Sequence, residues 1–579
     1  MLWLTGCAAV MIGAFAVGAA DAQTTVDVAG FGAVPDDGLD DTQPFLAALR
    51  QASQPGAHQV VLHGGRYDLE AGRNPDNAQV LFALSNVDGL TIDGGGAELM
   101  VKGATSLFSF ANCRNITLRN FTVDCARAPF SVGEVIAAEP RWFDVRMGEE
   151  FPVSGGEPVG AFMDYDPATR LPARHGLDVY GDVERTELMA PQTLRVHLAR
   201  DIPVPVGHLV VLRHWVYGHN AFAFHRCADV AVEDVTVYAT PGMGLIGIVS
   251  ENVSLRRFNV LIRPGTERLM SATADATHFG GCKGTVALTD CVFEGMGDDG
   301  ANVKSGLYLT IRKRLDDHTV LGQHNLKMVD LPDPGDTMEM LHTDTLLSYG
   351  SGRVRSAALE PGEGNVHRVE FEAPLPEELR EGDVLGNASR TPRLRMTGCT
   401  VRRNRARGVL CQTRDALIER CTFEDCTSAG VLVMTEVVYF FESIGTRDVT
   451  VRDCRFVNCN YGAASAEAAL QAFAWLKGSA YPPEPGVHHN VVFEGNTISG
   501  TDDAAIFAAG VEGLTIRNNT IEQACRSPRR ELGHDAIYVM SSSGVVLEGN
   551  RVDPAGQGEG YVTDVRVIGA SPGASDAPR

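Results

Sequence analysis

An eight-residue pattern recurs ten times along the chain, and it limits the possible folds more than any other feature of the sequence. Each copy reads apolar, any residue, apolar, two polar residues, one residue suited to stacking, any residue and a final apolar residue. The closest copies are 22 to 23 residues apart, and longer loops separate the others. The copies begin at Ile116, Val230, Val253, Val286, Leu394, Ala416, Val449, Val491, Leu514 and Val545.

This period predicts an all-β fold, a right-handed parallel β-helix that resembles the pectate-lyase solenoid. Each coil would stack on the previous one at the ordinary strand spacing of about 4.8 Å. Equivalent residues of successive copies would then form ladders along the solenoid. An all-β sandwich, the alternative architecture, predicts no such register.

The cysteines fit these ladders better than they fit a disulfide framework. The chain has 13 cysteines, and those at positions 291, 399, 421 and 454 occupy the stacking position of the pattern. Free cysteine behaves as a small buried apolar residue, so we expect a structural role. Oxidation of individual pairs, such as Cys421 with Cys426, is left open because exported proteins can hold disulfides.

The start of the predicted solenoid carries a capping element. Residues 26–38 read as a strand and a turn, and residues 40–49 read as a short helix. The helix has an Asp at its N-cap and Pro44 in its first turn. We expect this helix to cover core and strand edges that an open solenoid end would expose.

Two interruptions of the pattern are too long to be single coils. Residues 130–212 and 307–392 contain alternating strands and end in similar sequences, which predicts two small β-barrels mounted on the solenoid. The expected order is a signal peptide at 1–22, N-terminal coils at 23–129, barrel 1 at 130–212, coils carrying the site at 213–306, barrel 2 at 307–392, C-terminal coils at 393–565 and a disordered tail at 566–579.

The first 22 residues have the pattern of a signal peptide. An apolar run precedes the small residues Ala20 and Ala22, which are typical of a cleavage site before Gln23. A single membrane anchor is the alternative, but the apolar run is shorter than the roughly 20 residues that a span needs. We therefore expect export to the periplasm or the medium, with no membrane span in the mature chain.

Charge restricts the partners. The formal charge of −23 disfavours nucleic acid, whose phosphates need a basic surface. It suits a neutral or cationic substrate and mildly disfavours a polyanionic one, although a local basic cleft could override it. A homodimer is compatible with the sequence, which does not set the oligomeric state.

Three carboxylates form the candidate catalytic centre. Asp298 and Asp299 are adjacent between Gly297 and Gly300, and Asp275 lies 24 residues before Asp299. The stretch from Asp275 matches the stretch from Asp299 position by position, so one coil would bring the two together. Because adjacent strand residues point to opposite faces, Asp298 and Asp299 share a face only if the two glycines form a corner.

Clustered carboxylates suit the hydrolysis of a glycosidic bond, which needs an acid and a second carboxylate. Repulsion among the crowded carboxylates should raise the pKa of one of them, and that carboxyl group would then act as the general acid. An arrangement of one carboxylate opposite two would leave room for a water, at the separation of roughly 6.5–9.5 Å typical of inverting enzymes. The alternative is that Asp298 and Asp299 belong to a solvent-exposed turn with no catalytic function. A calcium site is another, because β-helix lyases bind Ca²⁺ and Lys304 could then serve as a base.

Additional side chains are candidates for sugar binding. Trp215 and His219 lie in a cluster of aromatic and imidazole groups at 214–220, although packing of the insertion explains that cluster equally well. His278 and Asn302 occupy matching positions on the two carboxylate strands, and Lys304 follows on the second. Glu442 is a further acidic candidate, for which a surface position is the simpler expectation.

The three carboxylates, on a β-helix with two inserted barrels, resemble glycoside hydrolase family 110. The motif is Gly297-Asp-Asp-Gly-Ala-Asn302-Val with Asp275 before it, and the likeness extends from the strand and helix at 26–49 to about residue 565. The resemblance implies an exo-acting α-1,3-galactosidase, including enzymes that cleave the galactose of the blood-group B structure. Branched and linear α-1,3-galactosides remain open as substrates.

The resemblance also implies how the site works. The family's catalytic residues map onto Asp275, Asp298 and Asp299, with an inverting mechanism and no metal or other cofactor. Asp298 would be the general acid, and the other two would position the water. Family-28 polygalacturonases are the nearest competitor, but their Gly-His-Gly and Arg-Ile-Lys motifs are not found in this chain. A carbohydrate-binding adhesin without activity is the non-enzymatic alternative.

Overall fold

The computed structural model describes residues 24–569, apart from 56–57, 75–76, 78, 326–330, 464–465, 530 and 554–556. The predicted signal peptide lies outside the described residues. Among the helices that are described, none has the length and apolar character needed to cross a membrane.

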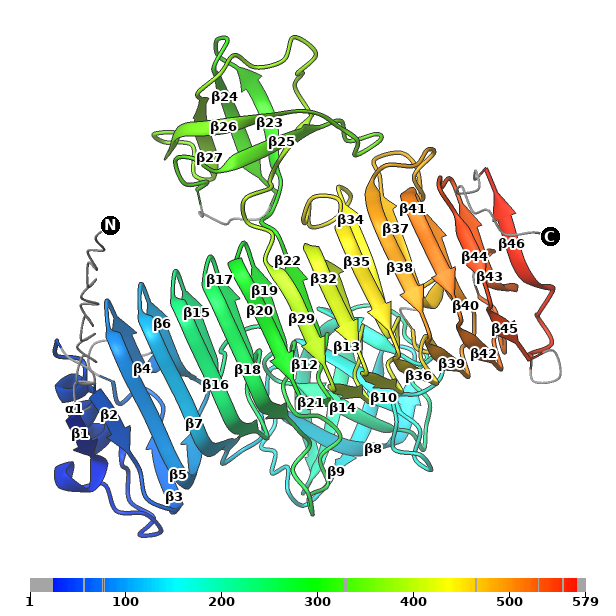
Figure 1. The fold of residues 1–579 in the computed structure, drawn as a ribbon. Coiled ribbons are helices and arrows are strands. Elements are labelled where there is room, and N and C mark those ends of the chain that lie inside the picture. Colours follow the sequence, from blue (N-terminus) through cyan, green and yellow to red (C-terminus); the bar gives the residue numbers. More distant parts are fainter. Residues whose placement is uncertain are drawn as a thin grey trace, which may run out of the picture.

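The described chain forms a parallel β-helix, with strands from successive coils stacked into two long sheets (Figure 1). The larger sheet has 21 strands and the smaller has 12. The larger consists of β1 (Thr24–Asp27), β2 (His58–Val61), β3 (Gly65–Glu70), β5 (Asp88–Lys102), β7 (Arg114–Cys125), β16 (Ala228–Val237), β18 (Glu251–Val260), β20 (Lys283–Thr289), β21 (Val292–Glu294), β29 (Arg393–Thr397), β30 (Thr400–Arg402), β32 (Arg414–Glu419), β33 (Thr422–Glu424), β35 (Arg447–Arg452), β36 (Arg455–Val457), β38 (His488–Glu494), β39 (Thr497–Ser499), β41 (Val511–Arg517), β42 (Thr520–Glu522), β44 (Val546–Glu548) and β45 (Arg551–Val552). The smaller consists of β4 (Val80–Ser85), β6 (Ser106–Ala111), β15 (Phe222–His225), β17 (Leu245–Ile248), β19 (Thr277–Gly280), β22 (Ala301–Lys304), β31 (Val409–Gln412), β34 (Val431–Glu436), β37 (Ala468–Trp475), β40 (Ala504–Ala509), β43 (Asp535–Met540) and β46 (Thr563–Ile568).

Successive copies of the sequence pattern stack in the predicted register. Val230 pairs with Val253 between β16 and β18, and Leu394 pairs with Ala416 between β29 and β32. The apolar positions of the copies meet in one continuous core inside the solenoid. The period of the apolar residues was therefore sufficient to predict the coil-to-coil alignment.

The stacking position forms a ladder of hydrogen bonds. The backbone N–H of Cys454 donates to Asn496 Oδ1 at 3.0 Å, and that of Asn496 donates to Asn519 Oδ1 at 2.9 Å. The backbone N–H of Cys421 reaches Cys454 Sγ at 3.4 Å. All the cysteines that the structure describes are free and buried, Cys426 included. In this structure Cys421 and Cys426 are both free, and Cys421 takes part in the ladder.

The helix α1 (Thr42–Ala52) and the 3₁₀ helix η1 (Val28–Phe31) lie at the N-terminal end of the solenoid (Figure 1). Phe45 packs against Phe82 of the second sheet, with ring centroids 5.7 Å apart, so the helix covers the core as predicted. The capping contact differs in detail, because Asp41 is the N-cap residue but makes no side-chain capping bond. The carboxylate of Asp40 instead accepts a hydrogen bond from the N–H of Thr42 at 3.0 Å.

The two insertions differ in how they close. The first is a seven-stranded antiparallel sheet, whereas the second is a closed six-stranded barrel. The first sheet ends at the unpaired edges of β11 and β12, so the prediction of a barrel was wrong there. The strands of the first are β8 (Phe130–Glu139), β9 (Trp142–Met147), β10 (Ala161–Tyr165), β11 (Asp178–Tyr180), β12 (Val183–Ala190), β13 (Thr193–Leu198) and β14 (Leu209–Arg213). The strands of the second are β23 (Leu309–Arg314), β24 (Thr319–His324), β25 (Thr337–Leu341), β26 (Ser348–Leu359), β27 (Val366–Phe371) and β28 (Val384–Asn387).

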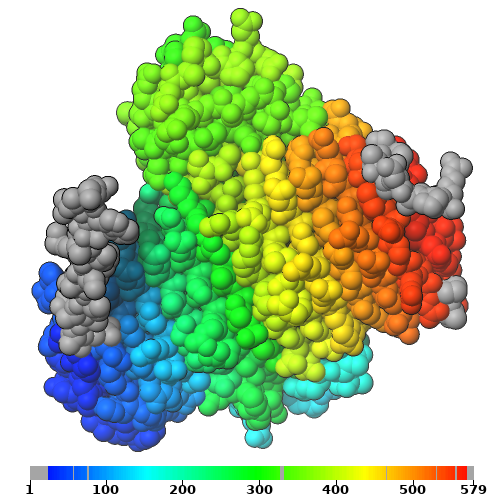
Figure 2. Space-filling model, in the orientation of Figure 1, coloured from blue at the N-terminus to red at the C-terminus, as the bar shows by residue number. Residues whose placement is uncertain are grey.

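Both insertions lie against the middle of the solenoid. Figure 2 shows the barrel as a lobe on one side of the stacked coils, and Figure 1 shows the first insertion on a different side. At the C-terminal end, β46 includes residues 566–568, so the tail predicted to begin at 566 was wrong for these residues. Residues 570–579 lie outside the described part of the chain.

Candidate active site

The coil that carries the three carboxylates has the predicted register. Thr277 pairs with Ala301, and His278 pairs with Asn302, between β19 and β22. The N–H of Ala276 also donates to the carbonyl oxygen of Asp299 at 2.9 Å. The position-by-position match between the two stretches is confirmed, and it places Asp275 directly beside Asp299 in the next coil.

The two glycines allow close packing of the coils at this point. A Cβ on Gly297 would lie 2.4 Å from the carbonyl oxygen of Thr273, and one on Gly300 would lie 2.6 Å from that of Gly408. Neither glycine has a positive φ angle. Glycine is therefore required here because neighbouring backbone leaves no room for a side chain, rather than for a left-handed turn.

The three carboxylates converge. One oxygen from each of Asp275, Asp298 and Asp299 lies within 4.8 Å of the others. The three residues are buried, at 3%, 8% and 1% exposure, and Asp275 Oδ1 accepts a hydrogen bond from the N–H of Asp299 at 3.2 Å. The separation of roughly 6.5–9.5 Å typical of inverting enzymes is measured between whole carboxyl groups rather than between nearest oxygens, so it stays a prediction.

Two arginines that sequence analysis missed neutralise the cluster. Arg405 Nη1 donates to Asp298 Oδ1 at 3.0 Å. Arg407 holds Asp299 twice, through its backbone N–H at 2.9 Å and through Nη2 at 2.8 Å. Since each of these carboxylates has its own guanidinium partner, the site carries far less net charge than three aspartates suggest.

The sequence did contain a signal for these arginines. Gly300 and Gly408 each follow a ladder cysteine by nine residues, so Arg407 and Asp299 hold equivalent positions before them. The structure pairs Ala301 with Val409 in the same register. Only the long insertion between the two coils hid this relationship.

The pKa values of the carboxylates move in opposite directions. Burial raises the pKa of Asp275 well above its ordinary value, and the charge of Asp298 raises it further. Burial also raises the pKa of Asp299 well above its usual range, although Arg407 opposes the shift. Burial alone would raise the pKa of Asp298, but Arg405, Arg407 and a hydrogen bond from Tyr217 outweigh it and lower that pKa. The directions of these pKa shifts favour protonation of Asp275 or Asp299 over protonation of Asp298.

This proton placement differs from the role implied by family resemblance, in which Asp298 is the acid. The three groups interact strongly, so they titrate as one unit whose proton is shared. His278 contacts this unit through Nδ1, 2.7 Å from Asp275 Oδ2. Burial lowers the pKa of His278 to about 3, so its imidazole is neutral at ordinary pH.

We expect a pH profile that follows these shifts. A carboxylate that must be ionised becomes protonated as the pH falls through its raised pKa. The fall of kcat/KM on the acid side should therefore occur clearly above pH 4, where an ordinary aspartate titrates. Measuring kcat/KM between about pH 3 and pH 9 checks this prediction. An acid limb near pH 4 or below would contradict the raised pKa values of Asp275 and Asp299.

The first insertion and the segment that follows it contribute further groups to the site. The hydroxyl of Tyr217 donates to Asp298 Oδ2 at 2.5 Å, and Asp178 Oδ2 accepts from Arg405 Nε at 2.8 Å. The ring of Tyr180 lies 4.6 Å from the guanidinium of Arg213 and 4.9 Å from that of Arg405. The insertion thus fixes Arg405 in the position where it contacts Asp298.

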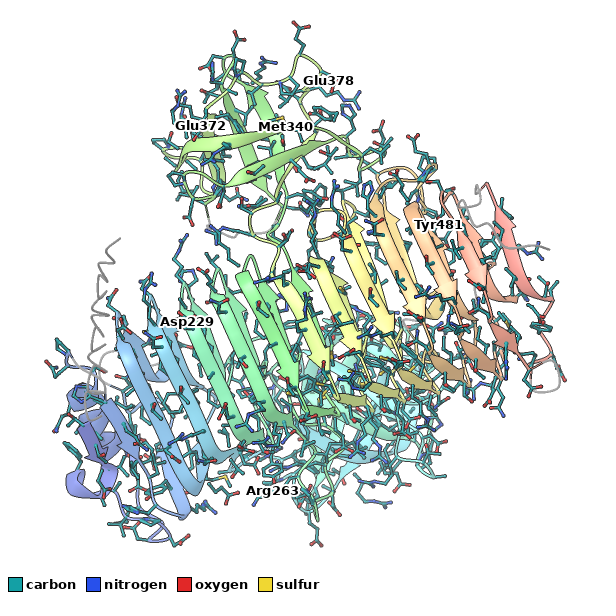
Figure 3. All side chains as sticks on the ribbon, viewed as in Figure 1. Asp229, Arg263, Met340, Glu372, Glu378 and Tyr481 are labelled. Carbon is teal, nitrogen blue, oxygen red and sulfur yellow. The ribbon has the colours of Figure 1, made fainter. Side chains whose placement is uncertain are left out.

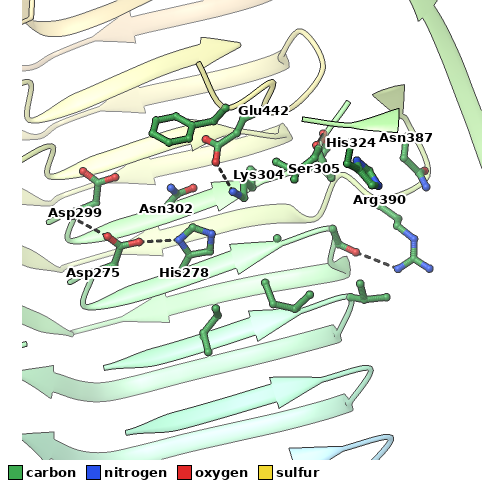
Figure 4. A pocket seen from close by; sticks show the side chains of 18 of the residues that line it. Asp275, His278, Asp299, Asn302, Lys304, Ser305, His324, Asn387, Arg390 and Glu442 are labelled. Carbon is green, nitrogen blue, oxygen red and sulfur yellow. Dashed lines mark hydrogen bonds and ion pairs between the residues drawn. The ribbon is translucent and has the colours of Figure 1, made fainter. Parts of the chain in front are cut away.

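A cavity of about 710 Å³ opens in front of the carboxylates, within the size range of ligand-binding pockets. His278, Asn302 and Lys304 line it beside the three aspartates, as Figure 4 shows for most of this set. Asn302 Oδ1 is buried and has no hydrogen-bond partner among the described residues, so it is available to a ligand hydroxyl. The barrel contributes further lining residues, including Met338.

Two predicted binding residues lie elsewhere. Trp215 and His219 are not among the residues that line the cavity; their rings pack on each other, with centroids 5.3 Å apart. Tyr217 is the member of that aromatic cluster that reaches the site. Residues close together in this segment point in different directions. The residue types alone do not predict which of them faces the cavity.

The expectation of a surface position for Glu442 was wrong. Its side chain is buried in the cavity wall and accepts a hydrogen bond from Lys304 Nζ at 2.5 Å (Figure 4). Burial would raise the pKa of Glu442, but the charge of Lys304 outweighs it and lowers that pKa. The Lys304–Glu442 ion pair adds polar groups with no net charge to the cavity wall, apart from the three catalytic carboxylates.

Comparison with known proteins found a matching family model, named relatives and a solved structure. A family model described as "Right handed beta helix region" matches residues 382–474 and 486–566, which agrees with the predicted hand. A protein of Phocaeicola vulgatus named alpha-1,3-galactosidase B is 28% identical, with 93% of this chain and 96% of that protein covered. A Parabacteroides distasonis protein of the same name is 24% identical over 98% of this chain and 99% of its own. The A-module of the Azotobacter vinelandii mannuronan C-5 epimerase AlgE4 superposes with a TM-score of 0.42 at 14% identity, with 95% of this chain and 100% of that one covered.

The resemblance to glycoside hydrolase family 110 is therefore confirmed, because the chain is similar to proteins named alpha-1,3-galactosidase over nearly its whole length.

Proposed function

We propose that this chain is an exo-acting α-1,3-galactosidase that hydrolyses terminal α-1,3-linked galactose from glycans. The observation that carries the proposal is the convergence of Asp275, Asp298 and Asp299 within 4.8 Å at the wall of a cavity. Paired carboxylates are the groups that glycoside hydrolysis requires. The similarity to named alpha-1,3-galactosidases selects the substrate among the many that such a site could accept.

The proposed chemistry treats the three carboxylates as a unit with one shared proton. The unit protonates the glycosidic oxygen, and a carboxylate that has lost its proton accepts one from the attacking water. Arg405 and Arg407 limit the charge that accumulates when the cluster ionises. Asn302 and the Lys304–Glu442 pair would hydrogen-bond to sugar hydroxyls in the cavity.

The direct test is release of free sugar from three substrates. Purified mature protein would be incubated with Gal-α-1,3-Gal, the branched blood-group B trisaccharide and polygalacturonate. Galactose from either α-1,3 substrate is the expected result, and the ratio between them would reveal whether a branch is required. Uronic products would instead indicate a pectin-degrading enzyme, and binding without any release would indicate an adhesin.

We also propose that hydrolysis inverts the anomeric configuration. Galactose should then appear first as the β-anomer, and NMR during the first minutes of reaction would detect it. One oxygen from each of the three carboxylates lies within 4.8 Å of the others, which does not by itself distinguish inversion from retention, so this measurement decides between them. Initial α-galactose would reject inversion and imply a covalent intermediate on one carboxylate.

We propose that catalysis needs no metal. Clustered carboxylates can bind Ca²⁺, but here Arg405 and Arg407 already hold Asp298 and Asp299 at 3.0 Å and 2.8 Å. A cation would have to displace them or overcome their repulsion. Activity should therefore remain within about 20% after EDTA treatment and dialysis, a change too small to be the loss of a catalytic ion. Loss of activity that added Ca²⁺ restores would refute this.

Export is a further proposal, supported by the apolar segment and small residues before Gln23. Cell fractionation followed by N-terminal sequencing tests it. A mature chain beginning at Gln23, in the periplasm or the medium, is the expected result. A full-length chain in the cytoplasm would reject the proposal.

A further inference from the structure

The loop that follows β34 is held rigidly by one buried carboxylate. Glu436 accepts hydrogen bonds from the backbone N–H groups of Val438, Tyr439 and Phe440, each at 2.7 Å. It also accepts from the N–H of Glu442 at 3.3 Å. On the barrel side, Asn325 Nδ2 donates to the carbonyl oxygen of Tyr439 at 2.7 Å. A loop with this many fixed backbone groups has one shape before any ligand arrives.

This rigid loop exposes aromatic side chains. Tyr439 is 63% exposed and Phe440 is 56% exposed, and Trp475 at the end of the neighbouring strand β37 is 37% exposed. The rings of Tyr439 and Trp475 are in contact, with centroids 5.7 Å apart. Trp475 in turn contacts the buried ring of Phe473, also at 5.7 Å. We call Tyr439, Phe440 and Trp475 the aromatic platform.

The aromatic platform is continuous with the catalytic cavity. Phe440 and Glu442, from the same loop, both line that cavity, and Glu442 is bound to Lys304 on β22. Beneath the platform, the buried ring of Phe473 contacts Tyr481 at a centroid distance of 6.1 Å. Figure 3 shows Tyr481 near the upper ends of the neighbouring strands, on the same side as the barrel. The platform therefore leads outward from the cavity along the solenoid.

Exposed aromatic groups held in place next to a binding cavity indicate a recognition surface. The apolar face of a pyranose ring packs well on an aromatic ring, and a tyrosine or tryptophan adds a polar edge for hydroxyl groups. Single exposed apolar residues need no explanation, but Tyr439 and Phe440 are adjacent on the preformed loop, and Trp475 of β37 contacts Tyr439. Their chemistry suits an uncharged sugar chain, and no charged side chain belongs to the platform.

We propose that the aromatic platform binds the sugar units that follow the terminal α-1,3-linked disaccharide, on the side of the glycan that becomes the leaving group. The inference rests on the proposed function, because it assumes that galactose occupies the cavity beside the carboxylates. It deepens that function by defining the substrate as an extended oligosaccharide rather than a disaccharide. Because Glu436 already holds the loop in one conformation, the sugar chain binds without having to order the loop first.

The kinetic test compares a short and a long substrate. Gal-α-1,3-Gal would be compared with a linear tetrasaccharide that ends in the same disaccharide. In the Tyr439→Ala and Trp475→Ala variants, kcat/KM for the tetrasaccharide should fall about tenfold, whereas that for the disaccharide should change less than about twofold. Tyr439→Phe and Trp475→Phe each keep an aromatic ring at the position and should retain the preference for the longer substrate.

Val206→Ala is the matched control, because Val206 is similarly exposed, at 59%, on the first insertion. It should leave both substrates unaffected. If the alanine variants lose kcat/KM equally on the two substrates, or lose it on neither, the proposed role of the aromatic platform is wrong.

A binding measurement separates failure of the platform from failure of the proposed function. The probe is the trisaccharide that remains after galactose is removed from the tetrasaccharide, titrated by calorimetry without any turnover. Binding that weakens in Tyr439→Ala supports the platform even if the enzyme cleaves neither substrate. Unchanged binding overturns it, and conversion of a dimer to a monomer by Tyr439→Ala would assign the surface to a second copy of the chain instead.

Discussion

Replacing Asp298 with asparagine is expected to lower kcat on Gal-α-1,3-Gal about a thousandfold while leaving sugar binding nearly unchanged. Asparagine has the same shape, and its amide oxygen can still accept the hydrogen bond from Arg405 that Asp298 Oδ1 accepts now. It can neither give a proton to the glycosidic oxygen nor carry the negative charge. Steady-state kinetics gives the loss in kcat, and calorimetry with galactose gives the binding.

Asp415→Asn is the control for this experiment. Asp415 is exposed on the larger sheet and has a φ of 55°, which asparagine tolerates, so neither fold nor activity should change. A kcat for Asp298→Asn within about threefold of wild type would reject a catalytic role, because such a small effect is typical of a bystander.

The same variant shows which carboxylate supplies the proton. An aryl galactoside has a leaving group that needs little protonation, so loss of the acid should matter much less on that substrate. If Asp298 is the acid, as the family resemblance implies, Asp298→Asn will regain activity on the aryl substrate. If the Asp275–Asp299 pair supplies the proton, as the pKa directions favour, the recovery will appear in Asp275→Asn or Asp299→Asn instead.

The solenoid could be predicted from sequence because its information is local and repeated. Each copy of the pattern places apolar residues at the same positions, and the pairing of Val230 with Val253 follows from that alone. The same logic matches Asp275 to Asp299 from the residue order of their two stretches, and the pairing of β19 with β22 confirms it. The closure of the first insertion was mispredicted because barrel and open sheet share the same alternation of residues along each strand.

The remainder of the site depends on contacts between distant segments. Tyr217 and Asp298 are 81 residues apart, and Arg407 and Asp299 are 108 residues apart, with an insertion between the second pair. Net charge carries no information on this point, because the chain as a whole is acidic while Asp298 and Asp299 have local arginine partners. Glu442 was placed at the surface because nothing in its own segment indicates the distant Lys304 that it meets.

Replacing Arg407 with methionine should lower kcat/KM near neutral pH about a hundredfold and move the acid limb of the pH profile upward. Methionine fills much of the same space but removes the charge that lies 2.8 Å from Asp299. Arg407 opposes the rise in the pKa of Asp299, so its loss raises that pKa further and leaves the carboxylate protonated over a wider range. Activity should therefore recover in part as the pH increases, a recovery that loss of a purely structural contact would not produce.

Arg452→Met controls for the loss of an arginine from the same solenoid. Arg452 pairs with Glu419 at 2.7 Å, an ion pair between successive coils that is half-exposed and does not line the cavity. Such pairs contribute little, so this variant should keep its activity and its pH profile. If Arg407→Met loses activity equally at every pH, the arginine acts through substrate contact or coil packing. If it loses none, the carboxylate cluster does not depend on its guanidinium partner, and the electrostatic account of the site is wrong. A shift of the acid limb to higher pH, found only in the Arg407 variant, would establish that this buried cation sets the proton affinity of the cluster.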